Sequence, residues 1–398
     1  MVIFCSDLLH EEFRSNPKFA ADTQSPTGVV ARDNRTTSYY FRRRYKLPNL
    51  ESLPDELLLG ILVRLPAHVI QDSVGLVCPK WYRLTRTRDF IHEHFQRATS
   101  GLILHSMMFP EEIIFISMKE GRVEKFRFRK EYYCNIWSSC NGLVFGISSH
   151  IKSDLCIFNP ATNQHYDLPP IYNRICSIFF SCLAFAAASK EYKVVLCHQE
   201  IEIVYCAIVT VGVDTSWRHV PVQHLSETSR TVLCKEFPWT TQGFVHWIKD
   251  GFDTMLTLNV EIETISESQV PLPLAHRGKR KFYLPTERYL TVLVALGKYS
   301  WDVWQMESET GEWLKVFSID LEDEKWRFDW FSRDCDENYI RPVGWIDYPD
   351  VLVFNPPPGN RSCIVYKVRT REIDSFELST LGGFYIFRFH KSSLLSVG

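Results

Sequence analysis

The sequence predicts a mixed fold in which a short helical module precedes a larger all-β, propeller-like domain of about six blades. First, residues 53–66 carry apolar side chains at helical spacing between two prolines. Second, aromatic residues make up 14% of the chain, which favours strands because flat rings pack well on a pleated surface. Third, segments of the form strand, turn, strand recur beyond residue 101.

Composition narrows the classes of partner. The net charge of -2 creates no global field that would attract nucleic acid or an anionic membrane, and neither partner is predicted. The basic run from Arg42 to Lys46 is interpreted as a solvated linker, with a nuclear address or a phosphate contact as alternatives. The apolar N-terminus stops at Leu9, and no run is long enough to span a bilayer, so we expect an intracellular protein. The 12 cysteines contain no C-x-x-C pair and are interpreted as small buried hydrophobes.

Three regions are expected along the chain. Residues 1–47 are polar and show no periodicity, which predicts a flexible N-terminal arm. Residues 48–97 form the helical module, and residues 100–398 form the β domain.

The first helix of the module is bounded by prolines. Pro54 suits the first helical position, where its missing N–H had no partner, and Pro66 ends the helix. Asp55 and Glu56 suit the positive end of the helix dipole. One apolar stripe is expected from Leu57, Leu58, Ile61, Leu62 and Leu65.

Two more helices are expected before residue 97. Pro79 would break a continuous helix, so it is predicted to open the third one, which presents Trp81 and Leu84 together. A unit near fifty residues buries too little surface to be stable alone. Its apolar stripes therefore need either another protein or the larger domain behind them. The second apolar stretch comprises Val69, Ile70, Val74 and Val77.

The module resembles the F-box, the motif that docks onto the Skp adaptor of cullin-based ubiquitin ligases. The pattern is Leu53-Pro54-x-Glu56-Leu57-Leu58-x-x-Ile61-Leu62-x-x-Leu65-Pro66, followed by Val77-Cys78-x-x-Trp81-x-x-Leu84. Two residues depart from it: Pro79, where lysine is usual, and Gly60 inside the first helix. The resemblance implies adaptor contacts by Leu53, Pro54, Leu57, Leu58, Ile61, Leu62, Leu65, Pro66, Val77, Trp81 and Leu84.

The β domain is predicted from a repeated hairpin whose turns recur about every forty to sixty residues, close to the length of a four-stranded blade. An inner strand often precedes the hairpin, as in Ser139–Phe145, Gln242–Trp247 and Pro342–Trp345. A β-sandwich with loop insertions is the alternative. The six hairpins are Phe115–Phe128, Cys156–Pro169, Ile208–Val222, Leu256–Pro273, Val303–Ile319 and Ile364–Leu378.

This domain also carries a resemblance. Four segments resemble the F-box-associated domain of the large plant F-box families, which is described as kelch-like or propeller-like. The doublet-glycine kelch signature is missing from most repeats, so a true kelch array is not predicted. The segments are Ser139–Leu143, Phe158–Pro170, Glu191–Val195 and Trp313–Ile319.

No catalytic, metal-binding or cofactor-binding residue is predicted. His92 and His94 lie two residues apart, so in a helix they point away from each other and cannot easily share one ion. Neither a phosphate-cradling glycine loop nor a G-x-S-x-G elbow occurs. Residues 321–339 form a candidate substrate-binding loop, because aromatic and arginine side chains are favoured interface anchors; packing between blades is the alternative. The loop's candidate anchors are Trp326, Phe328, Trp330, Phe331 and Arg333.

The expected function is that of the substrate receptor of a Skp–cullin–F-box ubiquitin ligase, a subunit without an active site of its own. Its partners would be the Skp adaptor, through it the cullin core, and an unidentified target protein. One alternative is a binding protein that uses the same helices without degradation. The other is a propeller enzyme.

Overall fold

The computed structural model describes twelve stretches of the chain, and the predicted arm, residues 1–47, lies outside them. All of them belong to one compact unit, Glu51–Gly398. The described residues are 53–106, 112–128, 134–148, 155–171, 180–200, 203–249, 254–270, 279–307, 310–331, 340–355, 361–378 and 385–397.

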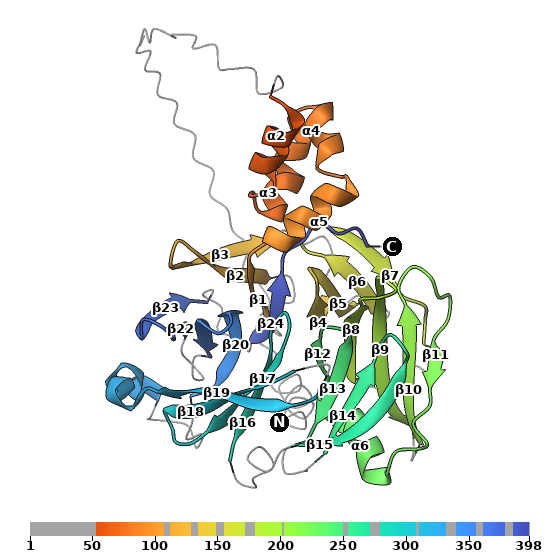
Figure 1. Ribbon diagram of the computed structural model, residues 1–398, viewed down its shortest axis with the longest axis vertical. Coiled ribbons are helices and arrows are strands. Elements are labelled where there is room, and N and C mark those ends of the chain that lie inside the picture. Colours follow the sequence, from red (N-terminus) through yellow and green to blue (C-terminus); the bar gives the residue numbers. More distant parts are fainter. Residues whose placement is uncertain are drawn as a thin grey trace, which may run out of the picture. The chain divides into compact units, whose positions relative to one another are not determined.

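Six antiparallel sheets of four strands follow one another around the β domain, which confirms the predicted propeller of about six blades (Figure 1). The first sheet, from its innermost strand outward, contains β24 (Tyr385–Lys391), β1 (Ser100–Ser106), β2 (Ile113–Lys119) and β3 (Arg122–Phe128). The second contains β4 (Cys134–Cys140), β5 (Leu143–Ser148), β6 (Leu155–Asn159) and β7 (Gln164–Asp167), and the third β8 (Phe180–Ala186), β9 (Glu191–Glu200), β10 (Ile203–Thr210) and β11 (Arg218–Val220). The fourth contains β12 (Trp239–Thr241), β13 (Phe244–Ile248), β14 (Thr254–Asn259) and β15 (Thr264–Gln269). The fifth contains β16 (Lys281–Pro285), β17 (Leu290–Ala295), β18 (Ser300–Met306) and β19 (Trp313–Asp320), and the sixth β20 (Pro342–Asp347), β21 (Val351–Phe354), β22 (Ser362–Lys367) and β23 (Glu372–Glu377).

Each of the six predicted hairpins forms the two outer strands of one blade. The predicted inner strands all fall within the inner pair of a blade. Ser139–Phe145 is not one strand, because it spans the turn between β4 and β5, and Gln242–Trp247 leads into β13, the second strand of its blade. Only Pro342–Trp345 lies in an innermost strand, β20.

The ring is closed by a strand from the end of the chain. β24 pairs with β1 along its whole length, from Ser100 opposite Lys391 to Ser106 opposite Tyr385. The innermost strands then contact one another in the order β4, β8, β12, β16, β20, β24 and back to β4. Closure of this kind removes exposed sheet edges, which are sites of aggregation.

The two faces of the ring are defined by the direction of the innermost strands. We call the face where these strands begin the entry face and the face where they end the exit face. Because Ser100 lies opposite the last residue of β24, β1 begins at the exit face. The helices that precede β1 are therefore joined to the exit face.

Each hydrophobic core cluster of the β domain lies between two neighbouring blades. Three fully buried tryptophans supply much of this packing: Trp247 between the third and fourth blades, and Trp301 and Trp345 between the fifth and sixth. The Trp345 indole N–H donates to Thr291 Oγ1 at 2.9 Å, so its polar atom is satisfied inside the core. The aromatic side chains that are frequent in the sequence thus form contacts between neighbouring blades.

The helical module contains four α-helices and a short 3₁₀ turn among the described residues, not three helices. Pro79 is the first residue of its helix, as predicted, but the first helix ends at Leu62 and Pro66 instead caps the second. The fourth helix, which was not predicted, starts after Thr87, whose hydroxyl accepts from the Phe90 N–H. The elements are α2 (Asp55–Leu62), α3 (Ala67–Asp72), η3 (Val74–Leu76), α4 (Pro79–Leu84) and α5 (Arg88–Arg97).

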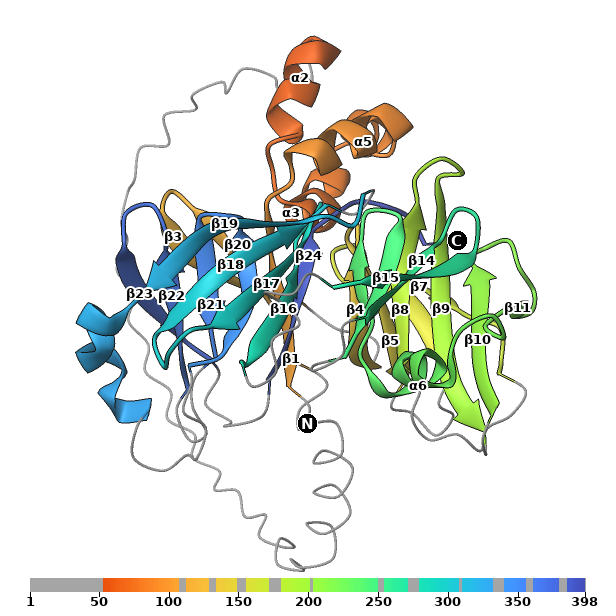
Figure 2. The ribbon, with the colours of Figure 1, turned by 60° about the horizontal axis from the view of Figure 1, so that its bottom comes forward.

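Within the described part of the β domain, two helical segments interrupt the strands. Helix α6 (Glu227–Lys235) precedes β12, and the 3₁₀ segment η4 (Glu322–Phe331) precedes β20 (Figure 2). Each follows the outermost strand of one blade and precedes the innermost strand of the next, and therefore belongs to the entry face. Across the described stretches, no helix combines the length and apolar character that crossing a membrane would require.

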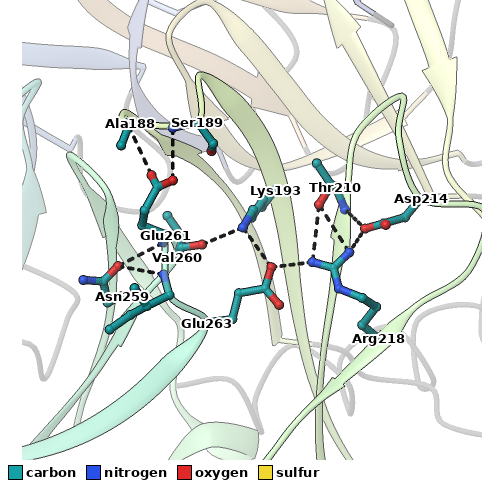
Figure 3. Close-up of polar contacts among 11 residues, drawn as sticks. Ala188, Ser189, Lys193, Thr210, Asp214, Arg218, Asn259, Val260, Glu261 and Glu263 are labelled. Carbon is teal, nitrogen blue, oxygen red and sulfur yellow. Dashed lines mark hydrogen bonds and ion pairs between the residues drawn. The ribbon is translucent and has the colours of Figure 1, made fainter.

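A polar network joins the third and fourth blades (Figure 3). The buried Lys193 ammonium donates to Glu263 Oε1 at 2.8 Å and to the Val260 carbonyl oxygen at 2.9 Å. Arg218 pairs with the same Glu263 carboxylate and with Asp214. The turn between β14 and β15 is therefore tied to two strands of the preceding blade.

Glu263 should make this junction sensitive to acid. Burial alone would raise the pKa of Glu263, but the hydrogen bonds and charges of Lys193 and Arg218 outweigh it and lower the pKa. The network's contribution is therefore complete above the unfolded-state pKa of about 4.3 and is lost as pH falls through the lower folded-state value.

We expect Glu263→Gln to lower the free energy of unfolding by about 1 kcal/mol at neutral pH, because the pair is only partly buried. The difference from wild type should shrink below about pH 4. Urea denaturation of both proteins at neutral and acidic pH measures this. A difference that stays constant with pH would contradict the assignment.

Candidate functional site

Helix α2 divides its apolar stripe between two faces. Leu58 and Leu62 are each only 1% exposed, whereas Leu57 and Ile61 are 59% and 53% exposed. Residues four apart lie one above the other on a helix, so each pair forms its own short ridge. One ridge belongs to the core and the other faces solvent.

A second group of exposed apolar side chains follows in η3 and α4. Leu76 is 81% exposed, and Val77 and Tyr82 are exposed as well. Together with Leu57 and Ile61, they account for five of the twelve large apolar side chains that are exposed among the described residues. We call these five residues the apolar patch. Such a concentration is typical of a protein interaction site.

Lys80 connects the two parts of the patch. Its ammonium lies 2.7 Å from Asp55 Oδ1 and donates to the Leu53 carbonyl oxygen at 3.2 Å. This ties the start of α4 to the start of α2. The contacts stabilise a fixed spacing between Leu57 and Tyr82, each of which lies about one turn into its helix.

The predicted adaptor-binding residues fall into three classes of exposure. Leu58 and Leu62 are core residues and cannot make a direct contact in this arrangement. Leu76 and Tyr82 were missed, although Leu76 stands next to a residue that the motif includes and Tyr82 next to Trp81. Pro54, Leu57, Ile61, Pro66 and Val77 are exposed, and Leu53, Leu65, Trp81 and Leu84 are partly buried.

The buried face of the module shares one core cluster with the first two blades. That cluster contains Leu58 and Leu62 from α2 together with Phe115 of β2 and Phe158 of β6. The ring of His68 in α3 stacks on Phe126 of β3, with centroids 3.6 Å apart. One face of the module therefore belongs to a core cluster that extends into the larger domain, and the other face is exposed to solvent.

His94 has a structural contact and His92 lies on the surface. Within α5, His94 is buried and its Nε2 lies 2.9 Å from the Leu65 carbonyl oxygen. Because a carbonyl only accepts, Nε2 carries the proton and donates. Burial lowers the pKa of His94, which keeps the ring neutral. Among the described residues, no group of three or more His, Cys, Asp and Glu side chains is arranged to hold a metal.

Gly60 lies on the exposed side of α2, beside the apolar patch. A methyl group at this position would meet nothing within 4 Å. Glycine in a helix costs about 0.5–1 kcal/mol relative to alanine, because it loses more backbone freedom on folding. We therefore expect Gly60→Ala to raise the free energy of unfolding by about that amount, measured by urea denaturation. An unchanged or lower value would show that the helix needs glycine here.

Residues from two of the segments that resemble the F-box-associated domain contact the residues after β24. Asn159 is fully buried, and its Nδ2 donates to the carbonyl oxygens of Ser393 at 3.0 Å and Leu395 at 2.8 Å. Gly142 adopts a φ of 83°, and a Cβ there would lie 2.2 Å from Ser393 Oγ and 2.7 Å from the Lys391 oxygen. These motif residues thus anchor the segment that follows the closing strand β24.

The predicted substrate-binding loop is largely the helical segment η4. Trp326 is exposed, and the Arg327 guanidinium lies 4.9 Å from the centroid of its ring. Phe328 is fully buried between the fifth and sixth blades, against Tyr299. It is therefore a core residue, as the packing alternative expected. Trp330 and Phe331 lie within η4, but their side chains, like Arg333, are outside the described residues.

Comparison with known proteins agrees with this architecture. The family described as the KIB1-4 beta-propeller matches residues 115–330, just over half of the chain. The Arabidopsis thaliana F-box protein At5g49610 is 26% identical over 286 residues, which cover 67% of this chain and 79% of that protein. The Arabidopsis thaliana F-box protein At3g07870 is 21% identical over 344 residues, covering 75% of this chain and 77% of that protein.

Among solved structures, a chain of a nidogen/laminin complex aligns with a TM-score of 0.43 and 10% identity, covering 74% of this chain and 99% of that one. The predicted resemblance to plant F-box proteins with a propeller-like domain is confirmed by the sequence relatives.

Proposed function

Because this chain belongs to the KIB1-4 beta-propeller family and is similar to plant F-box proteins, we propose that it is the substrate-recognition subunit of a Skp–cullin–F-box ubiquitin ligase. The helical module binds the Skp adaptor, and the β domain binds the protein to be ubiquitinated. The protein is intracellular, in the cytoplasm or the nucleus, where that machinery operates.

The observation that carries the proposal is the apolar patch. A helical module that had only to fold would bury its leucines, yet Leu57, Ile61 and Leu76 are more than half exposed. Exposing large apolar side chains costs free energy unless a partner covers them. The patch lies on the segment that carries the F-box motif, so the adaptor is the partner that fits it.

The chain contributes proximity and not chemistry. Holding a target near a ubiquitin-loaded enzyme raises the effective concentration of its lysine side chains. The shared core of the module and the first two blades supports this role, because a fixed junction keeps a bound target at a constant distance from the adaptor.

Affinity purification of the full chain from plant cells with the proteasome inhibited tests the proposal. We expect the Skp adaptor and a cullin to co-purify, and ubiquitinated proteins to accumulate in the same fraction. Recovery of the adaptor without a cullin would instead indicate a binding protein that does not promote degradation. Recovery of neither would refute the proposal.

A further inference from the structure

Arg388 is a half-buried cation. It lies on β24, and its Nε donates to the carbonyl oxygen of Trp137 on β4 at 2.9 Å, while Nη1 donates to the Phe387 carbonyl oxygen at 3.0 Å. No carboxylate of the described residues accepts a hydrogen bond or forms an ion pair with it. Burial, and after it the like charge of Arg341, lowers the pKa of Arg388 to about 10.

An arrangement of this kind is unfavourable unless something compensates it. Taking a charge out of water is unfavourable, and a nearby opposite charge normally offsets this cost. Here the nearest charge acting on Arg388 has the same sign. The side chain is partly accessible to solvent, so an anion from outside the chain can reach it.

Further positive charges lie at the entry ends of the two preceding innermost strands. Arg341 stands directly before β20, where its carbonyl oxygen accepts from the Asn355 N–H. Residues 279–281 read Lys-Arg-Lys at the start of β16. Lys281 is buried, so Lys279 and Arg280 are the exposed cations of this run, and β16, β20 and β24 are consecutive in the ring.

The other half of the ring presents aromatic side chains. Trp137 of β4 lies 6.2 Å from Phe237, which in turn lies 5.3 Å from Phe180 of β8. Trp239 of β12 and Tyr283 of β16 form a separate pair, with centroids 6.4 Å apart, and we call these five side chains the aromatic row. All but Phe180 are partly exposed. The backbone of Trp137 is also what holds Arg388, so the two halves meet at that strand.

We propose that the entry side of the innermost strands binds an acidic segment of the target protein, with its carboxylate or phosphate groups at Arg388 and Arg341 and an apolar side chain on the aromatic row. Charge-assisted hydrogen bonds from arginine are strong and geometrically specific, and aromatic residues supply buried area. The inference rests on the proposed function and names the class of target that the β domain recognises. Arg341 lies on the opposite face of the ring from the start of β1, and Arg388 lies midway along β24, so adaptor and target can be bound together.

Fluorescence anisotropy on the full chain tests the proposal with labelled short peptides. The first alternates glutamate and leucine, the second replaces glutamate by phosphoserine, and the third replaces it by glutamine. We expect one or both anionic peptides to bind, more weakly at high salt, and the glutamine peptide not to bind. The stronger of the two anionic peptides identifies the source of the charge.

Two variants locate the site. Arg341→Gln and Arg388→Gln should each weaken binding by about 10-fold or more, whereas Arg122→Gln, at the exit end of the outer strand β3, should bind normally. Arg341 is exposed, so its variant decides the matter if Arg388→Gln does not fold. The proposal would be overturned if the wild-type protein bound neither anionic peptide, or if both arginine variants bound as the wild type does.

Adaptor binding, measured on the same samples, should be unchanged in all three variants. If the wild-type chain does not bind the adaptor, the proposed function fails and the peptide result still stands by itself.

Discussion

Replacing Leu57 and Ile61 together by alanine should weaken binding of the Skp adaptor by about 100-fold and leave the fold intact. Both side chains are more than half exposed, so their removal creates no cavity in the free protein. Truncating a residue near the centre of an interface costs about 1–2 kcal/mol, and two such losses together give roughly this factor. Calorimetric titration with purified adaptor measures the affinity.

Two matched pairs separate binding from folding. Leu314→Ala with Val316→Ala removes a similar exposed apolar surface from β19 and should leave adaptor binding unchanged. Leu58→Ala with Leu62→Ala removes the buried ridge of α2, so each change should lower the free energy of unfolding by about 2–5 kcal/mol. Wild-type adaptor affinity in the Leu57 and Ile61 variant would refute the assignment of the apolar patch.

The sequence predicted the stripe of α2 but could not divide it. Leu57, Leu58, Ile61 and Leu62 all satisfy the same helical period, and periodicity cannot distinguish a core contact from a partner contact. The division depends on tertiary packing, because the core cluster that buries Leu58 and Leu62 also contains Phe90 of α5 and, far along the chain, Phe158 of β6. Tyr82 and Leu76 were missed because the motif's apolar positions did not include them.

The blades could be predicted because their hairpins form between residues that are close together in the sequence. Hairpins are local, and turns such as Lys119-Glu120-Gly121 mark them directly in the sequence. Ring closure by β24 is not local, because strand β1 is almost the whole β domain away in sequence. For the same reason the proximity of Arg341 and Arg388 could not be predicted from the sequence. They belong to different repeats and come together only because the ring closes.

Gly142→Ala should be among the most destabilising single methyl additions in the β domain, lowering the free energy of unfolding by about 3 kcal/mol or more. Alanine in the left-handed region costs about 1–2 kcal/mol by itself. The added methyl group would also lie 2.2 Å from Ser393 Oγ and 2.7 Å from the Lys391 oxygen, so the end of β24 must shift. That displacement would strain the strand that closes the ring.

Gly121→Ala is the matched control. Gly121 occupies the same position of a two-residue hairpin turn, has a φ of 74° against 83° for Gly142, and is preceded by a residue of positive φ in the same way. A methyl group there meets nothing within 4 Å, so only the conformational cost of about 1–2 kcal/mol applies. The difference between the two variants in urea denaturation therefore measures the contact with the C-terminal segment.

Hydrogen exchange should localise the effect to the closing strand. In Gly142→Ala the amides of Tyr385–Lys391 should exchange faster, because β24 holds the ring closed and its anchor on Asn159 would also be displaced. Equal losses of stability in the two glycine variants, with β24 equally protected, would show that the C-terminal segment does not contribute to closure. Because Arg388 lies on β24, Gly142→Ala should also weaken the binding of an acidic peptide at the entry face. Gly142 itself lies at the exit end of its blade, so this effect would be transmitted along the strand.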